Sequence, residues 1–364
     1  MVTILEVPPP AGPDDPQAWA ARAEAALWNA ENTTQFGYDD LNDPEATAVR
    51  LAVPSPHRLG LRWVALDDPA DTSSVVGVAA VSLSLHDNLT IATLQVVVRP
   101  EHRRQGVGTA LLEAAERRSV AEGRGTLQSW VTQVGDPGPD DPGVLRPREG
   151  SGLLDGNHPA ARFMLARGYA LEQVEVHSML RVPVAPAVID PLAAEAAAKV
   201  GDGYRLLNWV DRCPDDLVDA FAALRVAMID APAAGMAIEE EHWDADRVRT
   251  AEHRWAEAGV TSVTSVAQHV GTEELVGFTQ LIRFRERSDS AIQEDTVVVA
   301  GHRGHRLGMH LKVANLRLID RLWPGVRRIH TWNADENDYM RSINIALGFR
   351  PESAEGAWQK IVSR

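Results

Sequence analysis

The stretch "EHRRQGVGTALLEAAERR", residues 101–118, is the most informative part of this 364-residue chain. It places Arg103, Gly106 and Gly108 between an apolar run and a helical pattern, which predicts a strand entering a helix through Arg-x-x-Gly-x-Gly. The first turn of a helix has backbone N–H groups without partners, and the helix dipole adds positive potential there. Glycine lets a bulky anion approach the backbone, and arginine offers a fork of donors to phosphate oxygens. The stretch therefore predicts a pyrophosphate-binding turn; the alternative is an ordinary strand-to-helix turn with exposed arginines.

The motif belongs to an internal repeat. The run "VVVRPEHRRQGVGTALL" (96–112) returns as "TVVVAGHRGHRLGMHLK" (296–312), and "NHPAARFMLARGY" (157–169) returns as "NDYMRSINIALGF" (337–349). The offset falls from 200 to 180 because the first copy contains a Pro/Gly/Asp-rich insertion at 134–156, which predicts a surface loop. Two ordered copies weigh against the ordinary turn.

The repeat divides the chain into two domains, residues 1–182 and 204–364. Residues 183–203 are expected to form the linker, because prolines and closing glycines flank a short Ala-rich segment there. Each half has strand-like runs and amphipathic helices in the same order, which predicts an α/β domain with helices on both faces of its sheet. In the first half, the first helix is expected at about residues 15–28.

Composition limits the partners and the compartment. The net charge of −15 weighs against nucleic-acid binding and favours a cationic small molecule. No apolar run approaches the roughly 20 residues that cross a bilayer, so no membrane contact is expected. The N-terminus lacks a secretory signal and the single Cys213, which we interpret as structural, cannot form an internal disulfide, so we expect a cytoplasmic protein. Monomer and homodimer both stay open.

These motifs resemble the GNAT superfamily of acyl-CoA-dependent N-acyltransferases, present here as a tandem pair that covers nearly the whole chain. The resemblance rests on "RRQGVG" (103–108), "RGHRLG" (303–308) and the Asn-containing helices that end in Gly168-Tyr169 and Gly348-Phe349. It implies two GNAT-like domains with mixed sheets, in which the loop amides hold the pyrophosphate of acetyl-CoA. It also implies neighbouring strands that part to admit the pantetheine arm, with a free strand N–H polarising the thioester carbonyl.

The resemblance assigns acetyl-CoA contacts in both copies. In the first copy they are Val96, Val97, Val98, Arg103, Arg104, Gln105, Gly106, Val107, Gly108, Thr109 and Asn157. In the second copy they are Val297, Val298, Val299, Arg303, Gly304, His305, Arg306, Leu307, Gly308, Asn333 and Asn337.

The second copy departs from the first at Arg306, which replaces the glycine found at Gly106. A residue in ordinary helical geometry can still donate its N–H, and the guanidinium can itself reach phosphate. The opposite interpretation, that Arg306 blocks the loop, stays open.

The catalytic candidates lie in the second half. Many GNAT enzymes have a tyrosine that protonates the leaving thiolate, and its position holds Met164 in the first half and Asn344 in the second. We keep Asn344 as the matching site position, although an amide is no proton donor, and name the nearby Tyr339 as a candidate donor. Glu294 and Asp295 precede the second loop, in a region that supplies a general base in many members, and they favour chemistry in the C-terminal half. The alternative is that these carboxylates only mark the exposed start of a strand.

The segment between the first two helices of each half often lines the acceptor pocket in this superfamily. Here the second of these segments is "AIEEEHWDAD", residues 237–246, which is acidic and aromatic. We assign acceptor contacts to Glu239, Glu240, Glu241, Trp243 and Trp332, for a cationic amine. A solvated acidic loop is the alternative.

Metal binding is not expected. The spacing of His302, His305 and His310 lacks a clean ligand pair, and Asp136, Asp140 and Asp141 lie among prolines.

The sequence thus predicts an acetyl-CoA-dependent N-acetyltransferase that modifies a primary amine of a small, cationic molecule. One half, the C-terminal one by preference, would carry the chemistry, and the other would bind acetyl-CoA or support the pocket. The alternative function is a catalytically degenerate acyl-CoA sensor or scaffold, which the missing tyrosines favour.

Overall fold

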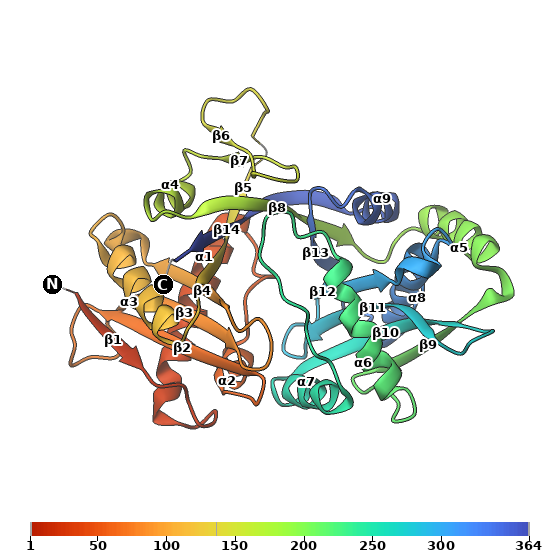
Figure 1. The fold of residues 1–364 in the computed structure, drawn as a ribbon, viewed down its shortest axis with the longest axis horizontal. Helices are drawn as coiled ribbons and strands as arrows, with labels where there is room; N and C mark the ends of the chain where they lie inside the picture. Colours follow the sequence, from red (N-terminus) through yellow and green to blue (C-terminus); the bar gives the residue numbers. More distant parts are fainter. Residues whose placement is uncertain (1, 136, 363–364) are drawn as a thin grey trace.

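The computed structural model describes residues 2–135 and 137–362, and a single mixed sheet of 12 strands runs through both halves (Figure 1). Its strand order is β1-β2-β3-β4-β5-β14-β8-β13-β12-β11-β10-β9. The strands of this sheet are β1 (Thr3–Val7), β2 (Arg58–Leu66), β3 (Val75–Ser84), β4 (Ile91–Val98), β5 (Thr126–Val134), β8 (Ala170–Arg181), β9 (Tyr204–Val210), β10 (Val260–His269), β11 (Leu275–Phe284), β12 (Ser290–Val298), β13 (Arg328–Ala334) and β14 (Arg350–Ile361).

Helices cover both faces of each half of the sheet, as the sequence predicts. They are α1 (Trp19–Phe36), α2 (Glu45–Ala52), α3 (Val107–Ala121), α4 (Pro159–Ala166), α5 (Pro186–Val200), α6 (Val218–Val226), α7 (Ala245–Glu257), α8 (Leu307–Leu322) and α9 (Asp338–Leu347). In the N-terminal half, α3 and α4 pack on one face through a core that includes Leu111 and Met164. Helix α1 packs on the opposite face through Ala20 and Leu27.

Helix α1 is longer than predicted and continues to Phe36. The polar residues after Trp28 do not end it, because Asn29 and Asn32 donate side-chain hydrogen bonds to the backbone oxygens of Asp43 and Leu41 in the following loop. The helix ends at Gly37, whose φ of 72° is the left-handed conformation that glycine adopts without strain.

The two halves exchange their last strands. Strand β8, which ends the N-terminal half, pairs with β13 from Arg181 opposite Arg328 to Glu175 opposite Ala334. Strand β14, which ends the C-terminal half, pairs with β5 from Ile361 opposite Thr126 to Ser353 opposite Val134, and also with β8. Neither half therefore completes its sheet with its own residues alone.

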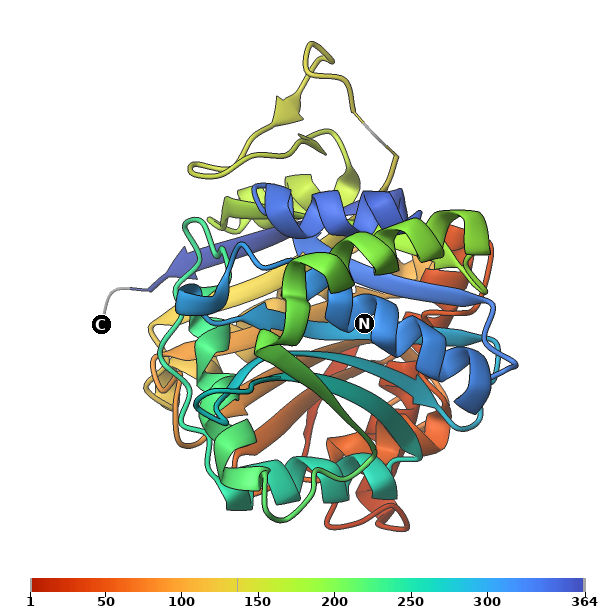
Figure 2. The ribbon, with the colours of Figure 1, turned by 90° about the vertical axis from the view of Figure 1, so that its right-hand side faces the viewer.

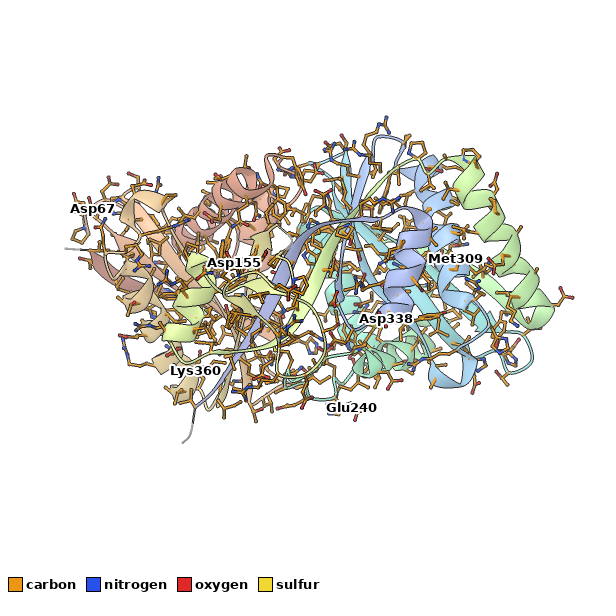
Figure 3. The ribbon with its side chains drawn as sticks, turned by 90° about the horizontal axis from the view of Figure 1, so that it is seen from above. Asp67, Asp155, Glu240, Met309, Asp338 and Lys360 are labelled. Carbon is orange, nitrogen blue, oxygen red and sulfur yellow. The ribbon has the colours of Figure 1, made fainter. Side chains whose placement is uncertain are left out.

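Side chains fix this exchange. The Lys360 ammonium at the end of β14 lies 2.9 Å from a carboxylate oxygen of Glu116 on α3 of the other half. Figure 3 shows Lys360 on the side of the N-terminal half, whereas Asp338, at the start of α9 in the same repeat, lies over the C-terminal half. The Tyr169 hydroxyl donates to the same Glu116 carboxylate at 3.0 Å, so the two chain segments share one anchor.

The predicted linker contains a helix. Its residues form α5, and Ile189, Ala193 and Ala196 of that helix are buried against a core that includes Met309 and Val313 of α8. None of the described helices is both long and apolar enough to cross a bilayer.

The insertion is a surface arm, as predicted. It contains the two-residue strands β6 (Val144–Leu145) and β7 (Leu154–Asp155), which pair with each other and project from the rest of the molecule (Figures 1 and 2). The Asn157 side chain donates to the backbone oxygen of Pro142 at 2.8 Å and so closes the arm.

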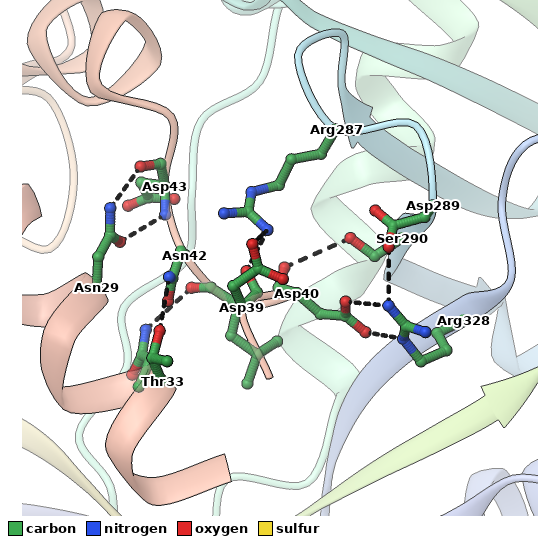
Figure 4. A network of polar contacts seen from close by, with 12 residues as sticks. Asn29, Thr33, Asp39, Asp40, Asn42, Asp43, Arg287, Asp289, Ser290 and Arg328 are labelled. Atoms are coloured by element: carbon green, nitrogen blue, oxygen red, sulfur yellow. Dashed lines mark hydrogen bonds and ion pairs between the residues drawn. The ribbon is translucent and has the colours of Figure 1, made fainter. Parts of the chain in front are cut away.

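A buried polar chain joins the α1–α2 loop to the exchanged strands. Asp40, whose side chain is fully buried, accepts hydrogen bonds from the Arg328 guanidinium and lies 2.9 Å from the Nε2 atom of His330. His330 contacts His177 of β8 at 3.0 Å, and His177 contacts the Ser353 hydroxyl of β14 at 3.1 Å. Figure 4 shows the Asp40 end of this chain between Arg328 and Ser290, with Arg287 on the neighbouring Asp39.

Candidate active site

The turn between β4 and α3 presents unpartnered amides. Arg104 and Gly106 adopt left-handed φ values of 63° and 86°. Among the described residues, the N–H groups of 104–109 donate to no backbone acceptor, and the first helical bond runs from Ala110 N–H to Gly106 O at 3.0 Å. Successive free amides at a helix N-terminus form an anion-binding concavity.

The turn between β12 and α8 has the same shape with a different sequence. Gly304 and Arg306 are left-handed there, at 84° and 61°, so the glycine and the arginine have exchanged positions relative to the first loop. The expectation of ordinary helical geometry at residue 306 is therefore wrong, because the loop requires a left-handed residue before α8. In the described part of the chain the N–H groups of 304–309 also lack backbone acceptors. The Arg306 guanidinium forms an ion pair with Glu195 of α5.

Arg103 and Arg303 brace their loops. The Arg103 Nε atom donates to the Val98 carbonyl at 2.8 Å, and its guanidinium lies 2.5 Å from the Glu31 carboxylate on α1. Arg303 repeats the pattern, with Val298 O at 3.0 Å and Asp230 at 3.0 Å. The sequence indicated the guanidiniums as phosphate ligands, and it had no signal for these carboxylate partners.

Strands part next to each loop. The parallel pair β4 and β5 is in register only from Ile91 opposite Thr126 to Thr93 opposite Gln128, after which the strands diverge. Strands β12 and β13 behave in the same way after Ile292 opposite His330. Because Arg99 donates its N–H to Val76 O on β3 at 2.8 Å, the alternation along β4 directs the Val96 and Val98 N–H groups toward the gap.

A cavity of about 1080 Å³ crosses the sheet at the gap of the N-terminal half. On the α3 and α4 face it is bounded by the first loop and by Phe163 and Met164. Between the faces it passes the parted ends of β4 and β5. The predicted residues that line it are Val96, Val97, Val98, Arg103, Arg104, Gly106, Gly108, Thr109 and Trp332.

On the α1 face lies the part of the cavity that we call the chamber, which is lined by residues of α1 and α2 and by Trp130, Trp332 and Glu355. The C-terminal half contributes Phe284, Ile292, Trp332 and Glu355 to the cavity lining. The sequence indicated Trp332 as an acceptor contact for its own half, but the structure places it on the cavity of the other half. Glu355 was missed, and its only signal is a carboxylate in a strand of the repeat.

The corresponding region of the C-terminal half is filled by side chains. Asp295 forms an ion pair with Arg225 of α6 at 3.1 Å, and the Arg225 guanidinium lies 4.0 Å from the Trp243 ring centre. The Glu294 side chain is exposed, but the surrounding protein desolvates its carboxyl, and this desolvation, followed by repulsion from Asp295, raises its pKa to about 7. Asp295 thus has a structural partner, whereas Glu294 keeps the protonation behaviour of a candidate base.

The acidic segment before α7 connects the two halves. The Glu239 carboxylate accepts hydrogen bonds from Leu89 N–H at 2.9 Å and from the Thr90 hydroxyl at 2.5 Å. The Glu241 carboxylate accepts from Trp243 Nε1 at 2.8 Å. The cavity lining does not include Glu239, Glu240, Glu241 or Trp243. Their predicted contacts with an acceptor therefore stay a prediction.

Helix α9 and its surroundings hold the remaining predicted residues. Tyr339 is half exposed, and a Cβ added to Gly308 would lie 3.7 Å from its hydroxyl, which places that hydroxyl next to the second loop. The Asn344 amide donates to the Asn333 side chain at 2.6 Å, and Asn337 caps α9 by accepting from Met340 N–H at 3.2 Å.

The other predicted side chains have local roles. Val107, Val297 and Leu307 are buried in the core, and Gln105 donates to Glu101 O at 2.9 Å. Burial raises the pKa of the Cys213 thiol to about 12, which fits a structural residue. Within residues 2–135 and 137–362 no three acidic, His or Cys side chains gather as a metal site; Asp136 lies outside the described residues.

Comparisons with known proteins agree with this geometry. A sequence-family model described as an acetyltransferase (GNAT) domain matches residues 59–137, which contain β4, the first loop and β5. No curated protein sequence matches the chain.

Solved structures match over the full length. A tandem GNAT protein from the clavulanic acid biosynthesis pathway is similar with a TM-score of 0.72 and 24% identity, over 100% of this chain and 99% of that one. A GCN5-related N-acetyltransferase from Sphaerobacter thermophilus is similar with a TM-score of 0.62 and 14% identity, over 99% and 96%. A glucosamine N-acetyltransferase region of a fungal multi-domain beta-N-acetylglucosaminidase has a TM-score of 0.60 and 16% identity, over 99% of this chain and 38% of that one. At these identities the likeness establishes the fold, which is two GNAT domains in tandem.

Proposed function

We propose that this chain, a tandem GNAT protein, transfers an acetyl group from acetyl-CoA to a primary amine of a small cationic molecule, with the reaction in its N-terminal half. The observation that carries the proposal is the cavity that crosses the sheet. It joins the unpartnered amides of residues 104–109 on one face to the chamber on the other. A thioester carrier and its acceptor would need such a passage to meet.

The residues of the first loop fit the pyrophosphate of coenzyme A. The loop amides are free among the described residues, and Gly108 leaves room beside Val98 and Phe163. The N–H groups of Val96 and Val98, directed into the gap, would orient the pantetheine arm and polarise the acyl carbonyl. When bound, acetyl-CoA supplies an acyl group activated as a thioester.

The sequence alone favoured the C-terminal half because of Glu294 and Asp295. Two observations favour the N-terminal half instead: the cavity lies there, and in the C-terminal half Arg225 and Trp243 occupy the face on which an acceptor would bind. We propose that the C-terminal half supports the site by lending β14 and the side chains that close the chamber.

No tyrosine stands at the position of the usual proton donor, where the cavity wall has Met164. A thiol has a pKa near 8.5, so a CoA thiolate is a tolerable leaving group near neutrality and water can protonate it afterwards. General acid help is worth ~10²–10⁴ in rate, so slow turnover is expected.

The chamber supports a cationic acceptor. Its walls include the indole rings of Trp28, Trp130 and Trp332, which attract cations through their faces. The Glu355 carboxylate lies among them without a described ion pair, whereas Glu24 is paired with Arg62. This support differs from the acidic segment at 239–241, which the sequence indicated.

The test combines binding and turnover. Titration calorimetry with acetyl-CoA measures the stoichiometry, and a thiol-release assay with a panel of primary amines measures transfer. Gly108→Trp should abolish transfer, because the added side chain starts 3.6 Å from Val98 Cγ2 and fills the cavity. Gly304→Trp in the other loop should leave transfer in place, because an added Cβ there meets nothing within 4 Å and the matching Arg104 has the same left-handed φ. The reverse pattern would assign the reaction to the C-terminal half.

The second candidate function is an acyl-CoA sensor or scaffold, which the missing proton donor favours. It predicts saturable acetyl-CoA binding without thiol release on any amine of the panel.

A further inference from the structure

Two glutamates face each other at the centre of the molecule. Glu175 of β8 and Glu355 of β14 are register partners, and they lie 180 positions apart, the offset of the second repeated motif. They are therefore equivalent residues of the two halves, brought together by the strand exchange. Directly opposed carboxylates repel each other and destabilise the sheet, which makes a functional role for the pair worth considering.

The face on which Glu355 lies follows from its neighbours. Ala354 and Val131 pack into the core on the α3 side of the sheet, so the next residues along each strand, Glu355 and Thr132, project to the α1 side. The Thr132 hydroxyl donates to the Glu355 carboxylate at 3.2 Å, which confirms that the two share a face. This is the face of the chamber, and Glu355 lines the cavity.

Basic partners neutralise two other carboxylates of the cavity. Glu24 forms an ion pair with Arg62 at 2.6 Å, and Glu31 forms one with Arg103 at 2.5 Å. Glu355 has no ion pair within residues 2–135 and 137–362; its described partner is the Thr132 hydroxyl. Asp43 also lines the cavity without a described ion pair, and desolvation raises its pKa as well; its side chain is exposed, whereas that of Glu355 is half-buried, so Asp43 is the rival base.

We propose that Glu355, supplied by the last strand of the C-terminal half, is the general base of the N-terminal site and takes the proton of the bound acceptor ammonium. The proposal rests on the proposed function. In this step one N–H bond of the ammonium breaks, its electron pair stays on nitrogen, and an O–H bond forms on the Glu355 carboxylate. The neutral amine is then free to attack the acyl carbon.

The local electrostatics suit this role. Desolvation, followed by repulsion from Glu175, raises the pKa of Glu355 to about 7, against the lowering effect of the Thr132 hydrogen bond. A base is most effective when its pKa lies near the working pH. Glu175 is held differently, because its carboxylate accepts from Trp130 Nε1 at 3.3 Å, so we assign it a positioning role through its charge.

The first experiment compares Glu355→Gln with Glu355→Asp and with the matched control Glu352→Gln from the same strand. In the amine assay, Glu355→Gln should lower kcat/KM at least ~100-fold, Glu355→Asp should restore part of it, and Glu352→Gln should stay within about twofold. Glu175→Gln should keep turnover but shift the acidic limb of the pH profile to lower pH, because a neighbouring negative charge is lost. Equal rates for Glu355→Gln and wild type would overturn the proposal. It would also be overturned if the acidic limb of the pH profile were present in Glu355→Gln at the same pH as in the wild type, because another group would then cause it.

A second experiment does not depend on the acceptor. Bromoacetyl-CoA places an electrophilic carbon where the acyl group lies, and an adjacent carboxylate oxygen displaces bromide to form an ester. Peptide mass spectrometry should find this ester on Glu355 and find none on Glu352. If the reagent binds by calorimetry but modifies only another residue, such as Asp43, or none, the proposal is wrong. If neither acetyl-CoA nor bromoacetyl-CoA binds, the proposed function itself fails, and so does this inference.

Discussion

At the level of single residues, the two loops show how an arginine can replace a glycine. Each loop has two left-handed positions, filled by Arg104 and Gly106 in one copy and by Gly304 and Arg306 in the other. A left-handed non-glycine residue costs roughly 1–2 kcal/mol, so each loop has the same strain at a different position. The backbone amides keep their directions in both, and the anion-binding shape depends on conformation more than on residue type.

Arg306→Gly should therefore stabilise the protein. Relief of the left-handed strain gains roughly 1 kcal/mol, whereas the exposed ion pair with Glu195 is worth about 0–1 kcal/mol. The free energy of unfolding in urea should rise, and Gly106→Arg, where an added Cβ meets nothing within 4 Å, should lower it by a similar amount. A destabilised Arg306→Gly variant would mean that the guanidinium does more than pair with Glu195.

Glu355→Gln should also be more stable than the wild type at pH 8. The pKa of Glu355 is raised to about 7 in the folded protein from 4.5, so the folded state retains its proton longer than the unfolded state as pH rises. Stability therefore falls between pH 4.5 and 7, by at most about 3 kcal/mol. Urea unfolding at pH 5 and pH 8 should show a gain for Glu355→Gln that is large at pH 8 and small at pH 5. A variant less stable at both values would indicate a purely structural glutamate.

The sequence revealed only part of the site at this scale. The glycine spacing predicted both loops, because tight turns leave a local signature in residue type. It could not predict that Glu31 pairs with Arg103, or that Glu355 reaches the N-terminal cavity, since both contacts join residues far apart in the chain.

At the level of elements, the loop between α1 and α2 is fixed by a buried charge. Desolvation alone would raise the pKa of Asp40, but hydrogen bonds from Arg328 and His330 outweigh it and lower the pKa to about 2. Phe36, the last residue of α1, and Leu41, in the middle of the loop, line the cavity. The contacts of Asp40 with Arg328 and His330 therefore hold one wall of the chamber against β13.

Asp40→Asn should destabilise the protein by about 3 kcal/mol, because it leaves Arg328 and His330 without their anion. The neighbouring Asp39→Asn, whose side chain is two-thirds exposed beside Arg287, should change stability by less than about 1 kcal/mol. Because the pKa of Asp40 is lowered, its contribution is present above pH 3.8 and is lost as pH falls toward 2. The difference between wild type and Asp40→Asn in urea unfolding should narrow over that range; a constant difference would contradict this account.

Elements with local periodicity were predictable from the sequence, and their pairing was not. Helices α3, α4, α8 and α9 lie where the repeated motifs placed them. The partners of β8 and β14 depend on contacts between distant segments, for which a single sequence has no local signal. The sequence predicted a linker in place of α5, because the prolines of this segment suggested a break in structure. They lie in the first half of a helix that packing stabilises.

At the level of the whole molecule, the strand exchange makes the halves interdependent. Strand β14 lies between β5 and β8, so the N-terminal half without it would have two unpaired strand edges and an exposed core. The buried Trp358 of β14 belongs to the core of the N-terminal half, which fixes the strand there. The domain boundaries at 182 and 204 thus separate the two copies of the repeat in the sequence. In the structure they cut β8 off from β13 and β14, and β14 off from β5.

We therefore expect fragments 1–182 and 183–364 to be unfolded or aggregated when produced alone, and to form a soluble complex when produced together, because the second fragment keeps α5 with its buried residues. The intact chain should unfold in a single urea transition, with the tryptophan fluorescence of both halves changing together. Size-exclusion chromatography and near-ultraviolet circular dichroism of the separate and co-expressed fragments test this directly. Fragment 1–182 with an added copy of residues 350–362 through a flexible linker should recover a folded N-terminal half, because it restores the missing strand and the Lys360 contact with Glu116. If fragment 1–182 folded alone as a monomer, the exchanged strand would be dispensable, and the placement of Glu355 in the N-terminal site would lose its structural basis.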